Sequence, residues 1–208
     1  MEIKVIAISG MPGAGSSTIG KLLAQELSMK SFSPGQLFKD IALGRVREQH
    51  YYKLFKHLCD LKGIKLPEVS SKNDSDAVID FWNTEIGKSK EFHEVLDLLQ
   101  IKLSKKEKIV IDGKLSLRML PDADLKIWLK ANIEARASRA AERDKISIEE
   151  AKKKIIEREK KERDEWKKIY GFDYFEQEKD ADIIIDASYY EPRAIVDIIL
   201  ANPILRNE

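Results

Sequence analysis

The feature that most constrains this chain is a glycine-rich loop between an apolar segment and a helical one. Residues 3–9 form an apolar, β-branched run, and residues 10–15 read Gly-Met-Pro-Gly-Ala-Gly. Apolar residues then recur at helical spacing from residue 19 to residue 27. A strand that is covered on both faces of a sheet need not alternate apolar and polar residues. The chain is therefore predicted to open with a buried parallel strand, a tight loop and a helix.

This loop has the backbone composition of an anion-binding site. Glycines let consecutive N–H groups turn toward one point, and the helix that follows adds a partial positive charge at its N-terminus. Ser17 stands where a P-loop has the hydroxyl that ligates Mg²⁺. Because the flanking strand and helix agree with the glycines, residues 10–18 are predicted to bind phosphate groups.

Ser16 departs from the P-loop pattern, which has lysine at this position. That lysine bridges the β- and γ-phosphates of a bound nucleotide, and the loss of one such contact typically costs about 3–4 kcal/mol. A serine donates a hydrogen bond but brings no charge. Either another cation replaces the lysine, or the chain binds a nucleotide without turning it over.

Strand and helix patterns alternate along the rest of the chain, which predicts an α/β fold with a parallel sheet. Further strands are expected at residues 31–32, 109–114, 125–129 and 183–186. Helical patterns at residues 51–63, 76–86 and 91–103 follow one another without a strand, which indicates a helical insert. The domains expected from this order are a core at 1–39, 106–131 and 174–208, an insert at 40–105 and an arginine-rich lid region at 132–173.

Composition excludes several classes of protein. Hydrophobic residues make up 43% and charged residues 35% of the 208, which is typical of a folded rather than a disordered chain. Lys and Arg number 37 against 36 Asp and Glu, so a general nucleic-acid binder is not expected. A single cysteine, Cys59, excludes an internal disulfide. No apolar run approaches the roughly 20 residues of a membrane span, and a cytoplasmic protein without membrane association is predicted.

Several charged residues stand at positions where they could bind a phosphate group or its metal ion. Asp112 ends the strand predicted to lie next to the loop's strand, where an acid can hold Mg²⁺ through water. Arg136, Arg139 and Arg143 recur on one face of a helix, and arginine suits a phosphoryl group because it offers two parallel hydrogen bonds.

A long helix is predicted to begin at Ser147 and to run to about residue 169. It has no apolar face between residues 157 and 165. A helical stretch that is polar on all sides must cross solvent or face charged groups. Arg158 lies in this stretch, which favours a lid role for it.

Four stretches together resemble the archaeal type of cytidylate kinase. They are Gly10 to Thr18, Ala123 to Ala131, the arginine-rich helix that follows, and Tyr170 to Asp173. The resemblance covers most of the chain outside residues 44–92. It implies transfer of the γ-phosphoryl group of ATP to CMP or dCMP with Mg²⁺. The implied fold is a P-loop kinase three-layer sandwich with about five parallel strands, a helical monophosphate-binding insert and a short lid.

The resemblance also implies roles for individual residues. The ATP phosphates would be held by the loop residues Gly10, Met11, Pro12, Gly13, Ala14, Gly15, Ser16, Ser17 and Thr18. Ser17 and Asp112 would hold Mg²⁺, and the catalytic set would be Asp112, Arg139, Arg143 and Arg158. Lys39, Asp97, Gln100 and Lys114 would bind the acceptor. Lys39, Lys114 and Leu99 stand where this family has arginine, so a weaker grip on the monophosphate is expected.

Two alternatives to a cytidylate kinase follow from these departures. The long insert and Leu99 are compatible with a related kinase that acts on another nucleoside monophosphate or small molecule. Ser16, Leu99 and the two lysines are compatible with a nucleotide-binding switch or scaffold that has lost catalysis. The sequence leaves the oligomeric state open.

Overall fold

The computed structural model describes residues 3–66, 81 and 83–205. Contacts divide the chain into two compact units. The first consists of Met1–Ser31 with Glu107–Glu208, and the second of Phe32–Lys106. No helix in the described ranges is long and apolar enough to cross a membrane.

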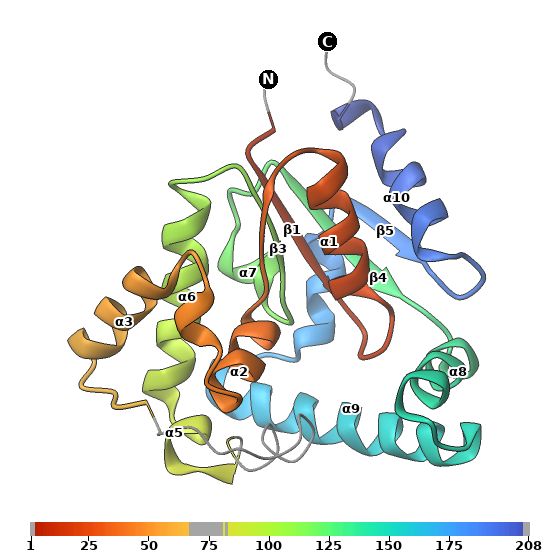
Figure 1. Cartoon of the computed structure of the whole chain (residues 1–208). Coiled ribbons are helices and arrows are strands. Elements are labelled where there is room, and N and C mark those ends of the chain that lie inside the picture. The colour runs from red at the N-terminus through yellow and green to blue at the C-terminus, as the bar shows by residue number, and fades with distance from the viewer. Residues whose placement is uncertain (1–2, 67–80, 82, 206–208) are drawn as a thin grey trace. The chain divides into compact units, whose positions relative to one another are not determined.

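A five-stranded parallel sheet forms the centre of the first unit (Figure 1). Its strands, in the order β2-β3-β1-β4-β5, are β2 (Lys30–Phe32), β3 (Ile109–Asp112), β1 (Val5–Gly10), β4 (Leu125–Lys130) and β5 (Ile183–Asp186). The predicted α/β class and all five predicted strands are thereby confirmed. β3 ends at Asp112 rather than at residue 114, because the chain turns there toward the short helix α7 (Ser116–Met119).

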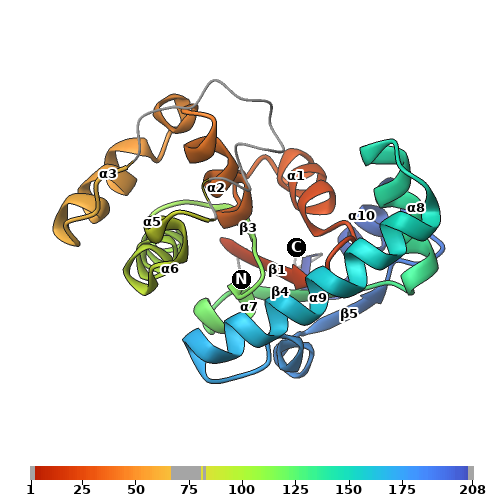
Figure 2. The same ribbon diagram turned by 90° about the horizontal axis from the view of Figure 1, so that it is seen from below.

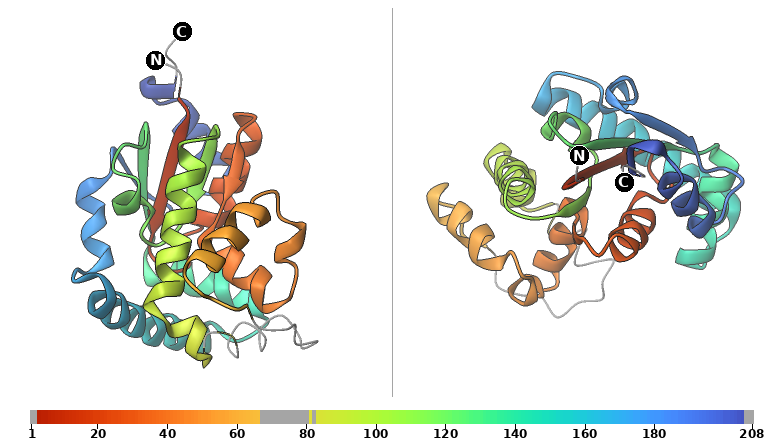
Figure 3. Two further views of the ribbon diagram at one scale, coloured as in Figure 1. Left: turned by 90° about the vertical axis from the view of Figure 1, so that its left-hand side faces the viewer. Right: turned by 90° about the horizontal axis from the view of Figure 1, so that it is seen from above.

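Helices cover both faces of this sheet and make three layers. Helices α1 (Ser16–Glu26) and α10 (Pro192–Leu200) lie on one face, and α7 with the 3₁₀ helix η2 (Tyr174–Asp180) lies on the other (Figure 3). The core between sheet and helices is aliphatic, and burying each of its large side chains contributes about 1.5–3 kcal/mol. It includes Ile6, Ile8, Leu23, Ile127, Leu129, Ile195 and Val196.

Helices α8 (Ile133–Asp144) and α9 (Ile148–Tyr170) form a pair after β4. Each begins at a capping residue: Asn132 accepts a hydrogen bond from the Ala135 N–H at 2.8 Å, and Ser147, the predicted start of the second helix, accepts one from the Glu150 N–H at 3.1 Å. The pair packs through small side chains, mostly alanines. Figure 2 shows α9 passing across the carboxyl ends of β1 and β4, which brings its polar stretch to the end of the sheet where the glycine loop lies.

The second unit is helical. Its elements are α2 (Pro34–Ala42), the 3₁₀ helix η1 (Val46–Glu48), α3 (Tyr52–Leu61), α5 (Glu85–Lys88) and α6 (Lys90–Ser104). Phe38, Phe81 and Phe92 pack together with ring centroids 4.7–5.9 Å apart. Most of the helix predicted at residues 76–86 lies outside the described residues.

Ser33 caps α2, and Pro34 occupies the first helical position, which suits proline. Gln36, three residues after the cap, does not complete a capping box with Ser33. Its side-chain amide donates instead to Asp40 one turn ahead, at 2.9 Å.

His93 makes the stability of the second unit sensitive to acid. Its side chain is buried, and burial lowers its pKa from 6.5 to about 4. Between these values the unfolded chain binds a proton that the folded chain rejects, so stability is complete above about pH 6.5 and falls as the pH drops toward 4. We expect wild type to lose roughly 2–3 kcal/mol of unfolding free energy between pH 7 and pH 4.5 through this group.

The measurement is urea unfolding at both pH values for wild type and for His93→Gln, which cannot titrate in this range. The variant should lose less stability on acidification than wild type. An equal loss in both proteins would contradict the assignment.

Candidate functional site

The glycine loop is formed by a close backbone approach between β1 and β4. A Cβ atom on Gly10 would lie 2.4 Å from the Leu129 carbonyl oxygen, so this position excludes a side chain. The neighbouring Met11 N–H donates to the same oxygen at 3.0 Å. Gly13 and Gly15 have φ values of 81° and 101°, a region that glycine enters without strain. These constraints turn the chain from the end of β1 into the first turn of α1.

Ser17 and Asp112 meet beside this loop. Asp112 ends β3, is 5% exposed and pairs in register with Ile8 of β1. The Ser17 hydroxyl donates to its Oδ2 atom at 2.7 Å. A Cβ on Gly20, one turn further along α1, would come within 3.3 Å of the Asp112 Cβ, so this helix packs tightly on the aspartate. A hydroxyl and a carboxylate at this spacing are the hard oxygen donors that suit Mg²⁺.

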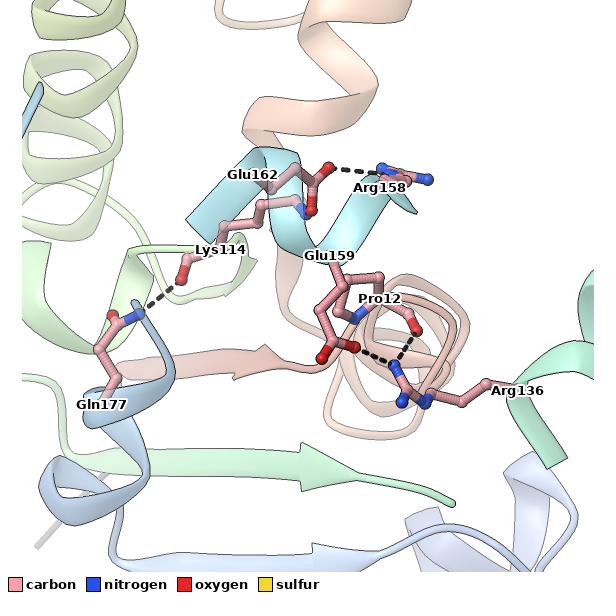
Figure 4. A network of polar contacts seen from close by, with 7 residues as sticks. All are labelled: Pro12, Lys114, Arg136, Arg158, Glu159, Glu162 and Gln177. Atoms are coloured by element: carbon pink, nitrogen blue, oxygen red, sulfur yellow. Dashed lines mark hydrogen bonds and ion pairs between the residues drawn. The ribbon is translucent and has the colours of Figure 1, made fainter. Parts of the chain in front are cut away.

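Arg136 connects the loop to both helices that follow β4. It lies on α8, is 6% exposed, and its Nη1 atom donates to the Pro12 carbonyl at 3.3 Å and to Glu159 of α9 at 2.7 Å (Figure 4). Its Cβ atom is 3.4 Å from the place that a Cβ on Gly13 would take. Its Nε atom is buried and has no hydrogen-bond partner among the described residues. The helical spacing of Arg136 with Arg139 and Arg143 is the sequence signal that points to this residue.

A second polar cluster joins the end of β3 to α9. Glu162, whose side chain is 14% exposed, forms an ion pair with Lys114 and accepts a hydrogen bond from Arg158 Nε at 2.8 Å. The Lys114 Nζ atom also lies 5.3 Å from the centre of the Tyr174 ring. The Lys114 backbone carbonyl accepts a hydrogen bond from the Gln177 side-chain amide at 2.6 Å (Figure 4). The predicted site residues Lys114 and Arg158 thus both form ion pairs with the Glu162 carboxylate.

Burial governs the protonation of this cluster. Desolvation, together with the smaller effect of the Arg158 charge, lowers the pKa of Lys114 to about 8 against the attraction of Glu162. Burial also raises the pKa of Glu162, but the two cations outweigh it and hold that pKa below its ordinary value. The polar stretch of α9 therefore faces charged groups, which confirms one of the two environments predicted for it.

Arg139 and Arg143 have other partners in the structure. Arg139 donates to the backbone carbonyls of Ala187 and Tyr190, which follow β5. Arg143 is exposed and donates through two nitrogens to Asp144, at 2.7 Å each. The hydrogen bonds of these two arginines within the described residues go to these groups and not to the glycine loop.

The remaining predicted residues lie in the second unit. Lys39 is half-buried on α2. On α6, the buried Gln100 donates its side-chain amide to Asp97 at 3.1 Å. Leu99 is fully buried in the unit's core, which explains an apolar residue at this position.

The amino-acid sequence matches the model of a known protein family. The model of the cytidylate kinase-like family matches residues 5–189. The cytidylate kinase of Pyrococcus horikoshii is 32% identical over 197 residues, which cover 95% of this chain and 86% of that protein. The cytidylate kinase of Methanocaldococcus jannaschii is 29% identical over 94% of both chains.

Solved structures share the fold at lower sequence identity. A protein from Eubacterium ventriosum superposes with a TM-score of 0.58 and 15% identity over the whole of both chains. A shikimate kinase from Acinetobacter baumannii, in complex with shikimate, has a TM-score of 0.52 and 17% identity over 95% of this chain and 91% of that one. These similarities place the chain in the α/β fold of P-loop kinases.

Glu162 is expected to contribute measurably to stability because it compensates Lys114 in a partly buried place. Glu162→Gln leaves that ammonium without its anion and should lower the free energy of unfolding by about 1–3 kcal/mol. Glu165→Gln is the matched control on the same helix, because its partner Lys161 is 62% exposed and lies 3.9 Å away. The control should change stability by less than about 0.5 kcal/mol in urea unfolding at pH 7. Equal losses in the two variants would show that the Lys114–Glu162 pair contributes no more to the free energy of unfolding than the exposed Lys161–Glu165 pair.

Proposed function

The chain belongs to the cytidylate kinase-like family, and we propose that it transfers the γ-phosphoryl group of ATP to CMP or dCMP. The products are ADP and CDP or dCDP. The observation that carries this proposal is the similarity to archaeal cytidylate kinases at about 30% identity along nearly the whole chain. The similarity to shikimate kinases supports the fold alone. The proposed acceptor rests on the sequence similarity to cytidylate kinases.

In this proposal the glycine loop holds the phosphates of ATP. The backbone N–H groups of Gly13, Gly15, Ser16 and Ser17 and the N-terminus of α1 attract the anion. Ser17 and Asp112 would hold Mg²⁺, since their oxygens already meet at 2.7 Å beside the loop. The ion would neutralise charge on the transferring phosphoryl group.

The chemical step needs no nucleophile from the protein. A phosphate oxygen of CMP forms a bond to the γ-phosphorus while the bond from that phosphorus to the β,γ-bridging oxygen breaks, and ADP leaves. The protein contributes by positioning the two nucleotides, stabilising charge and excluding water. Arg158, Arg139 and Arg143 are proposed as lid cations for this purpose, with Lys114 beside Arg158 on Glu162.

The second unit is proposed to bind the acceptor. Lys39 would meet its phosphate, and Asp97 with Gln100 would read the nucleoside. Lysine offers a point charge where arginine offers two parallel hydrogen bonds, so a modest affinity for the monophosphate is expected.

Ser16 is the observation that favours the second candidate function, a nucleotide-binding switch without turnover. The two functions differ in acceptor-dependent release of ADP. We expect ATP with CMP or dCMP to give rapid ADP release, and ATP with UMP, AMP or shikimate to give at least tenfold less. ATP binding without acceptor-dependent release would favour the switch, and a preference for another acceptor would identify a different kinase.

Asp112 is expected to be essential for turnover because it is the carboxylate proposed to hold Mg²⁺. Asp112→Asn removes the charge and keeps the shape, and should lower kcat by about 10²–10³-fold. It should also abolish the gain in affinity that Mg²⁺ gives to a non-hydrolysable ATP analogue in calorimetry. Ser17→Thr, which keeps a hydroxyl, is the matched control and should retain that gain. A Mg²⁺ dependence unchanged by Asp112→Asn would refute the metal assignment.

A further inference from the structure

We propose that Arg136 is the cation that replaces the missing loop lysine, and that its guanidinium contacts the γ-phosphoryl group of bound ATP. This inference rests on the proposed function, because it assigns a residue to the phosphate site of that kinase. Arg136 would then be a catalytic residue in addition to the lid arginines named from the sequence.

The position of Arg136 is fixed by the loop itself. Its Nη1 atom donates to the Pro12 carbonyl at 3.3 Å (Figure 4). Its Cβ and Cγ atoms lie 3.4 and 3.7 Å from the place of a Cβ on Gly13. These contacts hold the Arg136 side chain against the loop whose N–H groups are proposed to bind the phosphates.

The charge of Arg136 is compensated by one carboxylate and its donors are not all used. Glu159 is the ion-pair partner, at 2.7 Å. The guanidinium has five N–H donors, and the buried Nε atom finds no hydrogen-bond partner in the part of the chain that the structure describes. A buried donor without an acceptor is unfavourable, and a phosphate oxygen is a strong acceptor for it.

The other lid arginines are engaged elsewhere in the described part of the chain. Arg139 binds two backbone carbonyls after β5, Arg143 binds Asp144, and Arg158 binds Glu162. Ser16 supplies no charge. An arginine supplied by the same chain stabilises charge in phosphoryl transfer and raises kcat by 10³–10⁵ in characterised nucleotide hydrolases, which is enough to take over the role of a loop lysine.

The test removes the positive charge at position 136 and places one at position 16. Arg136→Gln keeps an amide donor for the Pro12 carbonyl but loses the cation, and we expect it to lower kcat at least about 100-fold. Adding Ser16→Lys to that variant restores the cation at the usual loop position and should raise kcat at least tenfold above that of Arg136→Gln. Ser16→Lys alone, in the wild-type background, should raise kcat much less. Arg193→Gln, on the surface of α10, is the control and should leave kcat unchanged.

A structural role for Arg136 would give a different pattern. A lysine at position 16 cannot rebuild the hydrogen bonds of Arg136 to Pro12 and Glu159, so the absence of recovery in the double variant would overturn the proposal. Full kcat in Arg136→Gln alone would overturn it as well. If Arg136→Gln does not fold, Arg136→Lys takes its place; it keeps the charge and should retain kcat within about tenfold, and a larger loss would count against the proposal.

A binding measurement separates this inference from the proposed function, because it needs no acceptor. Calorimetry compares ADP with a non-hydrolysable ATP analogue, which differ in the γ-phosphoryl group. Arg136→Gln should weaken binding of the analogue at least tenfold more than binding of ADP. Equal weakening of both would overturn the contact to the γ-phosphoryl group, whatever acceptor the wild type uses. Failure of wild type to phosphorylate CMP, with this selective weakening intact, would overturn the proposed function only.

Discussion

The pairing of β1 with a neighbour on each side is the constraint on which the candidate site depends. β3 on one side brings Asp112 into register with Ile8 and within reach of Ser17. β4 on the other side comes so close that Gly10 admits no side chain against Leu129. The loop, the carboxylate beside it and the start of α8 therefore follow from one sheet register, because parallel strands present their carboxyl ends at the same edge.

Ion pairs rather than an apolar seam attach the middle of α9 to the site. Glu159 meets Arg136, and Glu162 meets Lys114 and Arg158. Within these ion pairs two carboxylates meet three cations, at the end of the sheet where the phosphates are proposed to bind. A phosphate can compete for such cations, whereas an apolar contact would offer it nothing. This explains in physical terms why the helix has no apolar face between residues 157 and 165.

The sequence predicted those features that local rules determine. The five strands, the loop, the helix start at Ser147 and the place of Asp112 next to the loop's strand follow from patterns within a few residues or from the adjacency of parallel strands. The partners on α9 could not be predicted, because any of 36 acidic residues could compensate a given cation and only the path of α9 across the strands selects Glu159 and Glu162. The partners of Arg139 could not be predicted either, because they are backbone carbonyls and every residue of the chain has one. The domain boundaries and the roles of the acceptor residues stay predictions.

The central claim is that the backbone amides of the glycine loop hold the nucleotide's phosphates even though Ser16 replaces the lysine. The most direct measurement is a ¹⁵N-resolved NMR titration with Mg·ADP, which reports on each amide separately. Binding in the loop predicts that the largest changes in amide proton shift fall on Gly13, Gly15, Ser16 and Ser17, with the downfield direction of new hydrogen bonds to phosphate. Saturable binding that leaves these amides unmoved would contradict the claim.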